Sequence, residues 1–268
     1  MSGNSAFQLV DERGWRRGLG SMLGSEFSRW WKTRMWWVQS LIWMGLIGFM
    51  LGAVLFSAQE APPGAPPSED VAILFFIFAG LFPAVGVVII MQGVVVGEKK
   101  DGTASWVLSK PITRPAFILS KVVANGLGVL VTMVILPSVL AFSLNGIATG
   151  VPWNLPRFLA ALSVIFLNHF FFLSLTLMLG TFFGGRGPVI GIALGLLFLQ
   201  QNLIGWIPFL GKVLPWKLVI PLGEQLDAVA PCLLVGSHNY SPMLIVVIAL
   251  ESFLFIVIGL WRFSREEF

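Results

Sequence analysis

Long apolar runs alternate with short polar segments along the whole chain. Six runs are long enough, at about 1.5 Å per helical residue, to cross roughly 30 Å of hydrocarbon. The pattern predicts an all-α, polytopic membrane protein with six transmembrane helices, and Pro137 predicts a kink in the third. The six runs cover residues 38–57, 71–96, 116–144, 158–183, 188–207 and 242–261.

The composition supports the membrane assignment. Of the 268 residues, 56% are hydrophobic and 11% are charged, whereas soluble domains carry roughly 25% charged residues. The formal charge of +4 is better explained by basic residues that flank membrane spans than by a nucleic-acid partner, and we expect none. The single cysteine, Cys232, excludes an intramolecular disulfide and a multi-cysteine zinc site, and we expect no metal.

The distribution of positive charge predicts the orientation. If the N-terminus lies inside, fourteen of the seventeen Lys and Arg residues fall in cytoplasmic segments, and only Arg157, Lys212 and Lys217 lie outside. The reverse orientation would contradict the positive-inside tendency. We therefore expect a multi-pass protein of the cell (inner) membrane, with a cytoplasmic N-terminus (residues 1–37) and a cytoplasmic tail (residues 262–268).

The segment before the first span, residues 15–37, predicts an amphipathic interfacial helix. Its apolar side chains gather on one side of a helical wheel, although Glu26 and Thr33 intrude on that side. Tryptophan and basic residues are typical of helices at a membrane surface, and the tryptophan density disfavours the alternative of a disordered basic tail. The apolar side consists of Trp15, Leu19, Met22, Leu23, Phe27 and Trp30.

Two segments are expected on the outer side. Residues 61–70 form a Pro-rich loop without Lys or Arg, and residues 208–241 are amphipathic and interrupted by four prolines. The second segment predicts short broken helices that lie at, or dip into, the outer interface between spans five and six. Trp153, Trp206 and Trp216 fall near the outer boundary, where indole rings commonly sit.

The polar segment 97–121 reads GEKKDGTASWVLSKPITRPAFILSK and carries five of the seventeen Lys and Arg residues. Gly102 and Thr103 predict the start of a short helix over 103–109, which Pro111 ends. Thr113 is then an N-cap, and Pro115 is a first-turn proline that opens the third span. The pattern is consistent with a rigid knuckle outside the membrane or with a solvated loop.

This segment resembles the one after the second span in type-2 ABC exporter permeases. The span layout, the interfacial helix and the broken external segment are also similar to that family. The resemblance implies that segment 97–115 couples the permease to a separate cytosolic ATPase, which binds ATP and magnesium, and that two permeases pair as a homodimer or heterodimer. The residues it assigns to ATPase docking and coupling are Glu98, Gly102, Thr103, Trp106, Leu108, Ser109, Pro111, Arg114 and Lys121.

No catalytic motif accompanies this layout. The nearest string to a phosphate-binding loop, GWIPFLGKV from Gly205, has the wrong spacing and lies on the outer side. Zincin, nucleophile-elbow and paired Cys-His motifs are also missing from the sequence. We therefore expect a chain that is not an enzyme and has no cofactor of its own, with ATP hydrolysis on the partner subunit.

Several polar residues lie inside the apolar runs. Glu251 and His169 sit halfway along spans six and four, and Asn168 could join a contact between them. Ionisable residues at this depth usually face protein or a water-filled cavity, so they line a substrate pathway or brace two helices. Gln200, Gln201 and Asn202 in span five, with Gln92 and Asn125 nearer the cytosol, suggest interhelical hydrogen bonds or a substrate-facing stripe.

Glycines at every fourth position predict close helix packing rather than ligand sites. They are Gly48 and Gly52, Gly93 and Gly97, and Gly187, Gly191 and Gly195.

The leading hypothesis is the transmembrane permease subunit of an ATP-binding cassette exporter. An ion-coupled secondary transporter that uses Glu251 is the alternative, although the sequence shows no inverted repeat. A membrane-embedded enzyme or assembly factor is disfavoured because no catalytic constellation is present.

Overall fold

The computed structural model describes residues 14–57, 69–223 and 225–266. Over these residues the regular structure is entirely helical, and six helices are long and apolar enough to cross a membrane. The predicted fold class is confirmed. The spans are α2 (Met35–Ser57), α3 (Glu69–Met91) with α4 (Val96–Lys100), α6 (Arg114–Val129) with η2 (Leu130–Ile135) and α7 (Leu136–Thr149), α8 (Leu155–Phe182), α9 (Arg186–Trp206) and α12 (Met243–Ser264).

Helix boundaries differ from the prediction by a few residues at most ends. The helix α12 continues to Ser264 and therefore includes the first three residues of the expected tail. The helix α3 begins at Glu69, inside the expected external loop 61–70. The rest of that loop, residues 61–68, lies outside the described residues.

The third span is longer than a bilayer requires. Arg114–Thr149 contains 36 residues, which corresponds to about 54 Å of helix. Even a helix tilted by 40° needs only about 39 Å to cross 30 Å of hydrocarbon. The charged Arg114 and Lys121 lie near its N-terminal end. The helix begins two residues before the predicted start of this span and ends five residues after its predicted end.

The irregularity expected near Pro137 lies one turn before it. The residues of η2, Leu130–Ile135, form a π-helical turn that joins α6 to α7. Proline cannot donate to the carbonyl four residues earlier and its ring crowds that carbonyl, so a widened turn relieves the clash. Thr132 also donates its hydroxyl to the carbonyl of Gly128 (2.8 Å).

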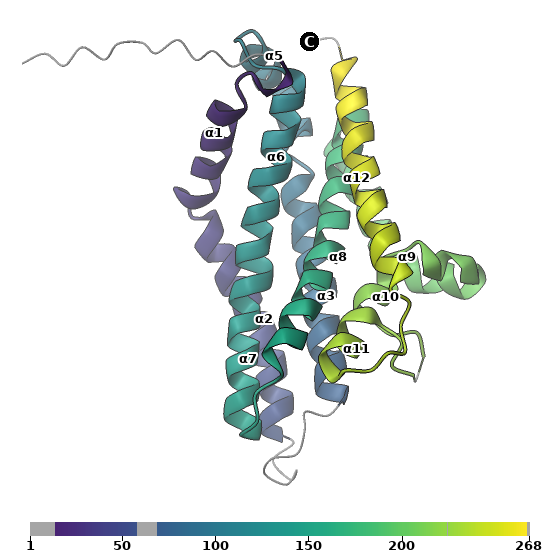
Figure 1. Ribbon diagram of the computed structural model, residues 1–268. Coiled ribbons are helices and arrows are strands. Elements are labelled where there is room, and N and C mark those ends of the chain that lie inside the picture. The colour runs from purple at the N-terminus through teal and green to yellow at the C-terminus, as the bar shows by residue number, and fades with distance from the viewer. Residues whose placement is uncertain (1–13, 58–68, 224, 267–268) are drawn as a thin grey trace, which may run out of the picture.

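The bundle is built around α8, which packs against α3, α11 and α12. The helix α1 (Leu19–Trp31) lies beside the upper part of α6, while α2 packs against α7 (Figure 1). The start of α6, the short helix α5 (Thr103–Leu108) and the end of α12 gather at one end of the bundle (Figure 1). This end contains the predicted coupling segment.

The segment between α9 and α12 folds back into the bundle. It forms η3 (Pro208–Lys212), α10 (Trp216–Val219) and α11 (Val229–Val235), which confirms the predicted short helices. The helices α10 and α11 pack against α3 and α8. A Cβ at Gly80 would lie 2.7 Å from the Val219 side chain, so glycine permits this close approach.

The three tryptophans expected at the outer boundary divide into two groups. Trp206 is 80% exposed, as a residue that faces the bilayer interface would be. Trp153 and Trp216 are buried, and Trp153 packs with Phe75 and Phe158 at centroid distances of 5.5 and 5.2 Å. Their indoles therefore stabilise the fold rather than anchor it to lipid.

The glycine pairs behave differently from one helix to another. Gly48 packs closely against Leu140 of α7, and Gly93 and Gly97 face the guanidinium of Arg186. A Cβ added at Gly187, Gly191 or Gly195 would meet no neighbouring atom within 4 Å. The close packing predicted for this stripe of α9 therefore does not occur within the described chain. The buried stripe of α9 begins two residues later, at Val189, about 200° around the helix.

We expect Gly128→Ala to destabilise the junction between α1 and α6. A Cβ at Gly128 would lie 2.4–2.7 Å from the buried indole of Trp30, and one at Gly126 would lie 3.7 Å from Phe170. Overpacking should cost about 1–3 kcal/mol at Gly128, whereas Gly126→Ala should be neutral or slightly stabilising. Thermal unfolding of the two purified variants in one detergent measures the difference. Equal midpoints would contradict the packing described here.

Candidate functional site

The coupling segment consists of two short helices separated by a glycine. The helix α4 ends at Lys100, and Gly102 adopts a left-handed conformation (φ 67°) that precedes α5. A side chain at this position would strain the backbone, which explains the glycine. The helix predicted over 103–109 is confirmed, with Leu108 as its last residue.

Thr113 joins three parts of this end of the molecule. Its hydroxyl accepts from the backbone N–H of Ala116 (3.3 Å), as predicted for an N-cap, and donates to the carbonyl of Trp15 (2.6 Å). Its own N–H donates to the carbonyl of Arg17 (3.1 Å). The residue that starts α6 therefore also holds the chain that leads into α1.

Three charged residues from three helices meet below this junction. Lys121 of α6 is fully buried, and its Nζ lies 2.6 Å from both Glu26 Oε1 of α1 and Glu98 Oε1 of α4. Arg29 lies 3.6 Å from the same Glu98 oxygen. We call Glu26, Arg29, Glu98 and Lys121 the charge cluster. Two carboxylates and two cations balance, and only Lys121 and Glu26 of the four are buried.

A tryptophan extends the same contact. Trp30 Nε1 donates to Asn125 Oδ1 (3.0 Å), and Asn125 Nδ2 donates to the carbonyl of Lys121 (2.8 Å). Trp30, Asn125 and Lys121 are all buried. The helices α1 and α6 are therefore joined along two turns by an ion pair and a side-chain hydrogen bond.

The sequence pattern missed the role of Glu26. The buried face of α1 consists of Met22, Glu26 and Trp30, spaced by four residues, whereas Trp15 is 51% exposed. The carboxylate that interrupts the apolar side is thus the centre of the contact. A buried carboxylate requires a cation, and the lysine inside α6 was the signal that could have indicated one.

The end of α12 closes onto the coupling segment. Arg114 donates to the carbonyls of Phe263 and Ser264, and the rings of Phe117 and Phe263 stack at 5.1 Å. Lys99 pairs with Glu266 (2.7 Å) and donates to the carbonyl of Thr181 (3.1 Å). The helix α4 is therefore in direct contact with α8 and the C-terminal segment, and the start of α6 is in direct contact with the end of α12.

The outer face of α5 carries an exposed tryptophan, which is unusual on a polar surface. Trp106 is 62% exposed, and Lys110 Nζ lies 3.5 Å from its ring centroid. Ser109 donates to the Trp106 carbonyl (2.7 Å). A shallow cavity of ≈ 360 Å³ lies beside this helix. We call Trp106, Lys110 and the residues of that cavity the coupling surface; the cavity residues are Ser105, Leu108, Ser109, Ile112 and Arg114.

The comparisons with known proteins agree with this arrangement. A family model described as ABC-2 family transporter protein matches residues 23–268, which include the charge cluster and the coupling surface. The chain belongs to the ABC-2 transporter family. A comparison with curated proteins finds no match. This ABC-2 protein is a multi-pass membrane permease of an ABC transporter, and the family implies an ATPase partner.

The ABC-2 permease has three polar residues near the middle of its spans. Asn168 Nδ2 donates to the carbonyl of Gly80 (2.9 Å), which joins α8 to α3. His169 is fully buried beside the backbone of Ala79, and neither ring nitrogen makes a hydrogen bond to a described side chain. Glu251 Oε2 is buried and also lacks such a partner. The described structure therefore shows no hydrogen bond or ion pair between Glu251 and His169.

The polar residues of α9 point in different directions. Gln200 is buried, and its Nε2 donates to the carbonyl of Leu197 (3.1 Å) in the same helix. Gln201 and Asn202 are exposed, so the three do not form one girdle that faces the bundle. Gln92 Oε1 is buried without a partner among the described residues. No group of three or more metal-binding side chains gathers in the described part of the chain.

Proposed function

We propose that this permease is the transmembrane subunit of an exporter whose energy comes from a separate cytosolic ATPase. The ATPase docks on the coupling surface, binds ATP with magnesium, and closes on nucleotide binding. The charge cluster transmits that movement to α1 and α6. The permease contributes the substrate pathway and pairs with a second permease.

The observation that carries this proposal is the set of direct contacts around α4 and α5. Glu98 reaches α1 and α6 through Lys121, Arg114 reaches α12, and Lys99 reaches α8 and the C-terminal segment. The helix α4 contacts α1, α6 and α8, and the exposed helix α5 packs against α4. This arrangement suits the transmission of force from a soluble partner. A solvated loop would not need buried charges at its base.

The charge distribution supports an orientation with this end in the cytosol. Lys99, Lys100, Lys110, Arg114 and Lys121 all belong to it, and cytoplasmic segments retain such excess positive charge. Both termini then lie on the cytosolic side of a bacterial-type inner membrane. The segment of η3, α10 and α11 lies on the opposite side.

Family membership favours this mechanism over an ion-coupled transporter. Co-expression of the full chain with the products of its neighbouring genes should yield a complex with a P-loop ATPase, whose ATP hydrolysis is at least a few fold faster than that of the ATPase alone. A P-loop lysine variant of the ATPase should bind equally well but show no hydrolysis. If no ATPase associates and a pH gradient without ATP drives uptake into vesicles, the ion-coupled alternative replaces this proposal.

A further inference from the structure

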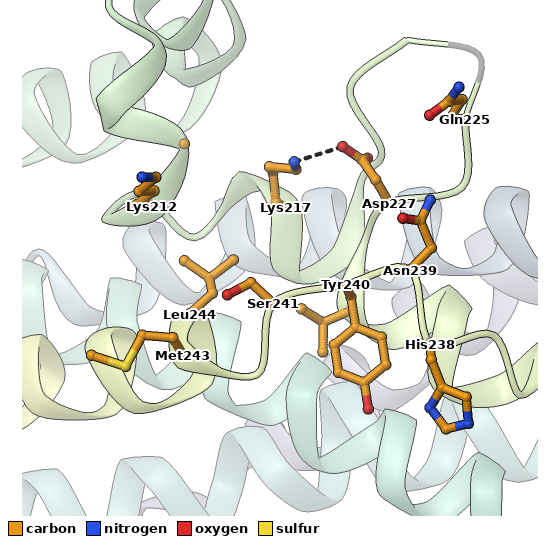
Figure 2. Close-up of a pocket in the computed structure, with 12 residues that line it drawn as sticks. Lys212, Lys217, Gln225, Asp227, His238, Asn239, Tyr240, Ser241, Met243 and Leu244 are labelled. Carbon is orange, nitrogen blue, oxygen red and sulfur yellow. Dashed lines mark ion pairs between the residues drawn. The ribbon is translucent and has the colours of Figure 1, made fainter.

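A second polar site lies away from the coupling surface, beside the N-terminal end of α12. Between η3, α10 and the start of α12 is a cavity of ≈ 680 Å³. Figure 2 shows Lys212, Lys217 and Asp227 around its upper rim, with Met243 and Leu244 on the wall below. The volume falls within the range of about 300–1,000 Å³ that is typical of small-molecule sites.

The charges in this cavity do not balance. Lys217 Nζ lies 2.6 Å from Asp227 Oδ2, and the other oxygen of Asp227 accepts from the N–H of Leu222 (3.0 Å). This pair neutralises itself. Lys212 is exposed and makes no ion pair or hydrogen bond with any residue that the structure describes. Among the described lining residues, one positive charge is therefore left available for a ligand.

The other side of the cavity is lined by apolar side chains at the start of α12. Met243, the first residue of α12, is 62% exposed, and Leu244 is buried at the base. Trp206 and Phe209, at the junction of α9 and η3, are 80% and 64% exposed. Exposed aromatic residues at the end of a span are typical of the interface between lipid and water. An alkyl chain can thus reach the cavity from the bilayer.

We propose that this cavity binds an amphipathic anion. Its acidic head group pairs with Lys212, which acts as a point charge for phosphate-like groups, and the hydroxyl of Ser241 supplies a further hydrogen-bonding group at the rim. The alkyl chain lies along Met243 and Leu244. The head group belongs either to an anionic phospholipid of the adjoining leaflet or to a free amphiphile.

The test measures saturable binding of radiolabelled dodecyl phosphate to the full chain in phosphatidylcholine nanodiscs, after subtraction of empty nanodiscs. Lys212→Gln should weaken binding about tenfold, as expected for loss of one charge-assisted contact. Lys212→Arg should remain within about twofold because the charge is kept. The matched control is Lys100→Gln, which removes an exposed lysine from the coupling segment and should not change binding.

Nanodiscs that contain phosphatidylglycerol distinguish the two sources of the head group. If they suppress dodecyl phosphate binding through Lys212, the occupant is the lipid; if they leave it unchanged, the occupant is a free amphiphile. Equal binding by Lys212→Gln and the unaltered protein, or equal competition by dodecanol and dodecyltrimethylammonium, would overturn the proposal. The assay needs neither ATP nor a partner, so its failure would leave the proposed function standing.

Discussion

Lys121→Met is expected to abolish most of the stability of the contact between α1 and α6. The substitution keeps the apolar length of the side chain but removes the cation that pairs with Glu26. The Glu26 side chain is only 7% exposed, so its charge would stay buried without a partner. Removal of one partner from a buried ion pair costs about 3–5 kcal/mol. The variant should show a much lower yield of monodisperse protein and a thermal midpoint several degrees below that of the unaltered chain.

A second substitution distinguishes electrostatics from packing. Lys121→Met combined with Glu26→Gln removes both charges, and it should recover most of the stability because Glu98 keeps Arg29 at 3.6 Å and is 19% exposed. The control Lys100→Met changes an exposed lysine in the same segment and should have little effect. If the double variant is no more stable than Lys121→Met alone, the cost comes from lost packing and not from an unpaired carboxylate.

A buried charge cluster is not the most stabilising way to join three helices. Apolar side chains of similar volume often give equal or greater stability. Charged groups instead restrict the geometry, because Lys121 is satisfied only where Glu26 and Glu98 both reach it at 2.6 Å. An element that must transmit movement without slipping benefits from this restriction. The cluster therefore supports a mechanical role for the contact between α1, α4 and α6.

The elements themselves could be predicted from sequence because their signals are local. Apolar length identifies a span, and capping chemistry places the start of α6 at Thr113 and the start of α5 after Gly102. Each of these signals lies within a few residues of the boundary that it sets. The full length of the third helix, Arg114–Thr149, was missed because burial against other helices and burial in lipid select the same apolar residues.

The partners within the site could not be predicted in the same way. Glu26 and Lys121 are 95 positions apart, and nothing in either local pattern specifies the other. In a uniformly apolar span, the sequence pattern also does not indicate which side of the helix faces the bundle. This explains why the pattern did not indicate that His169 and Glu251 make no hydrogen bond to each other, or that the glycine stripe of α9 faces away from the bundle.

Trp106→Ala is expected to weaken binding of the ATPase about thirtyfold without unfolding the permease. A tryptophan that is 62% exposed beside Lys110 contributes little to the fold, but tryptophans of this kind often dominate the affinity of an interface. The matched control is Trp206→Ala at the end of α9, where the indole is 80% exposed. Surface plasmon resonance with the immobilised permease in detergent measures both affinities, and thermal unfolding confirms that both variants are folded. Trp106 lies in α5 and Trp206 is the last residue of α9, so the comparison also tests which surface the ATPase binds. Equal losses for both variants, or a loss for Trp206→Ala alone, would remove the coupling surface as the docking site.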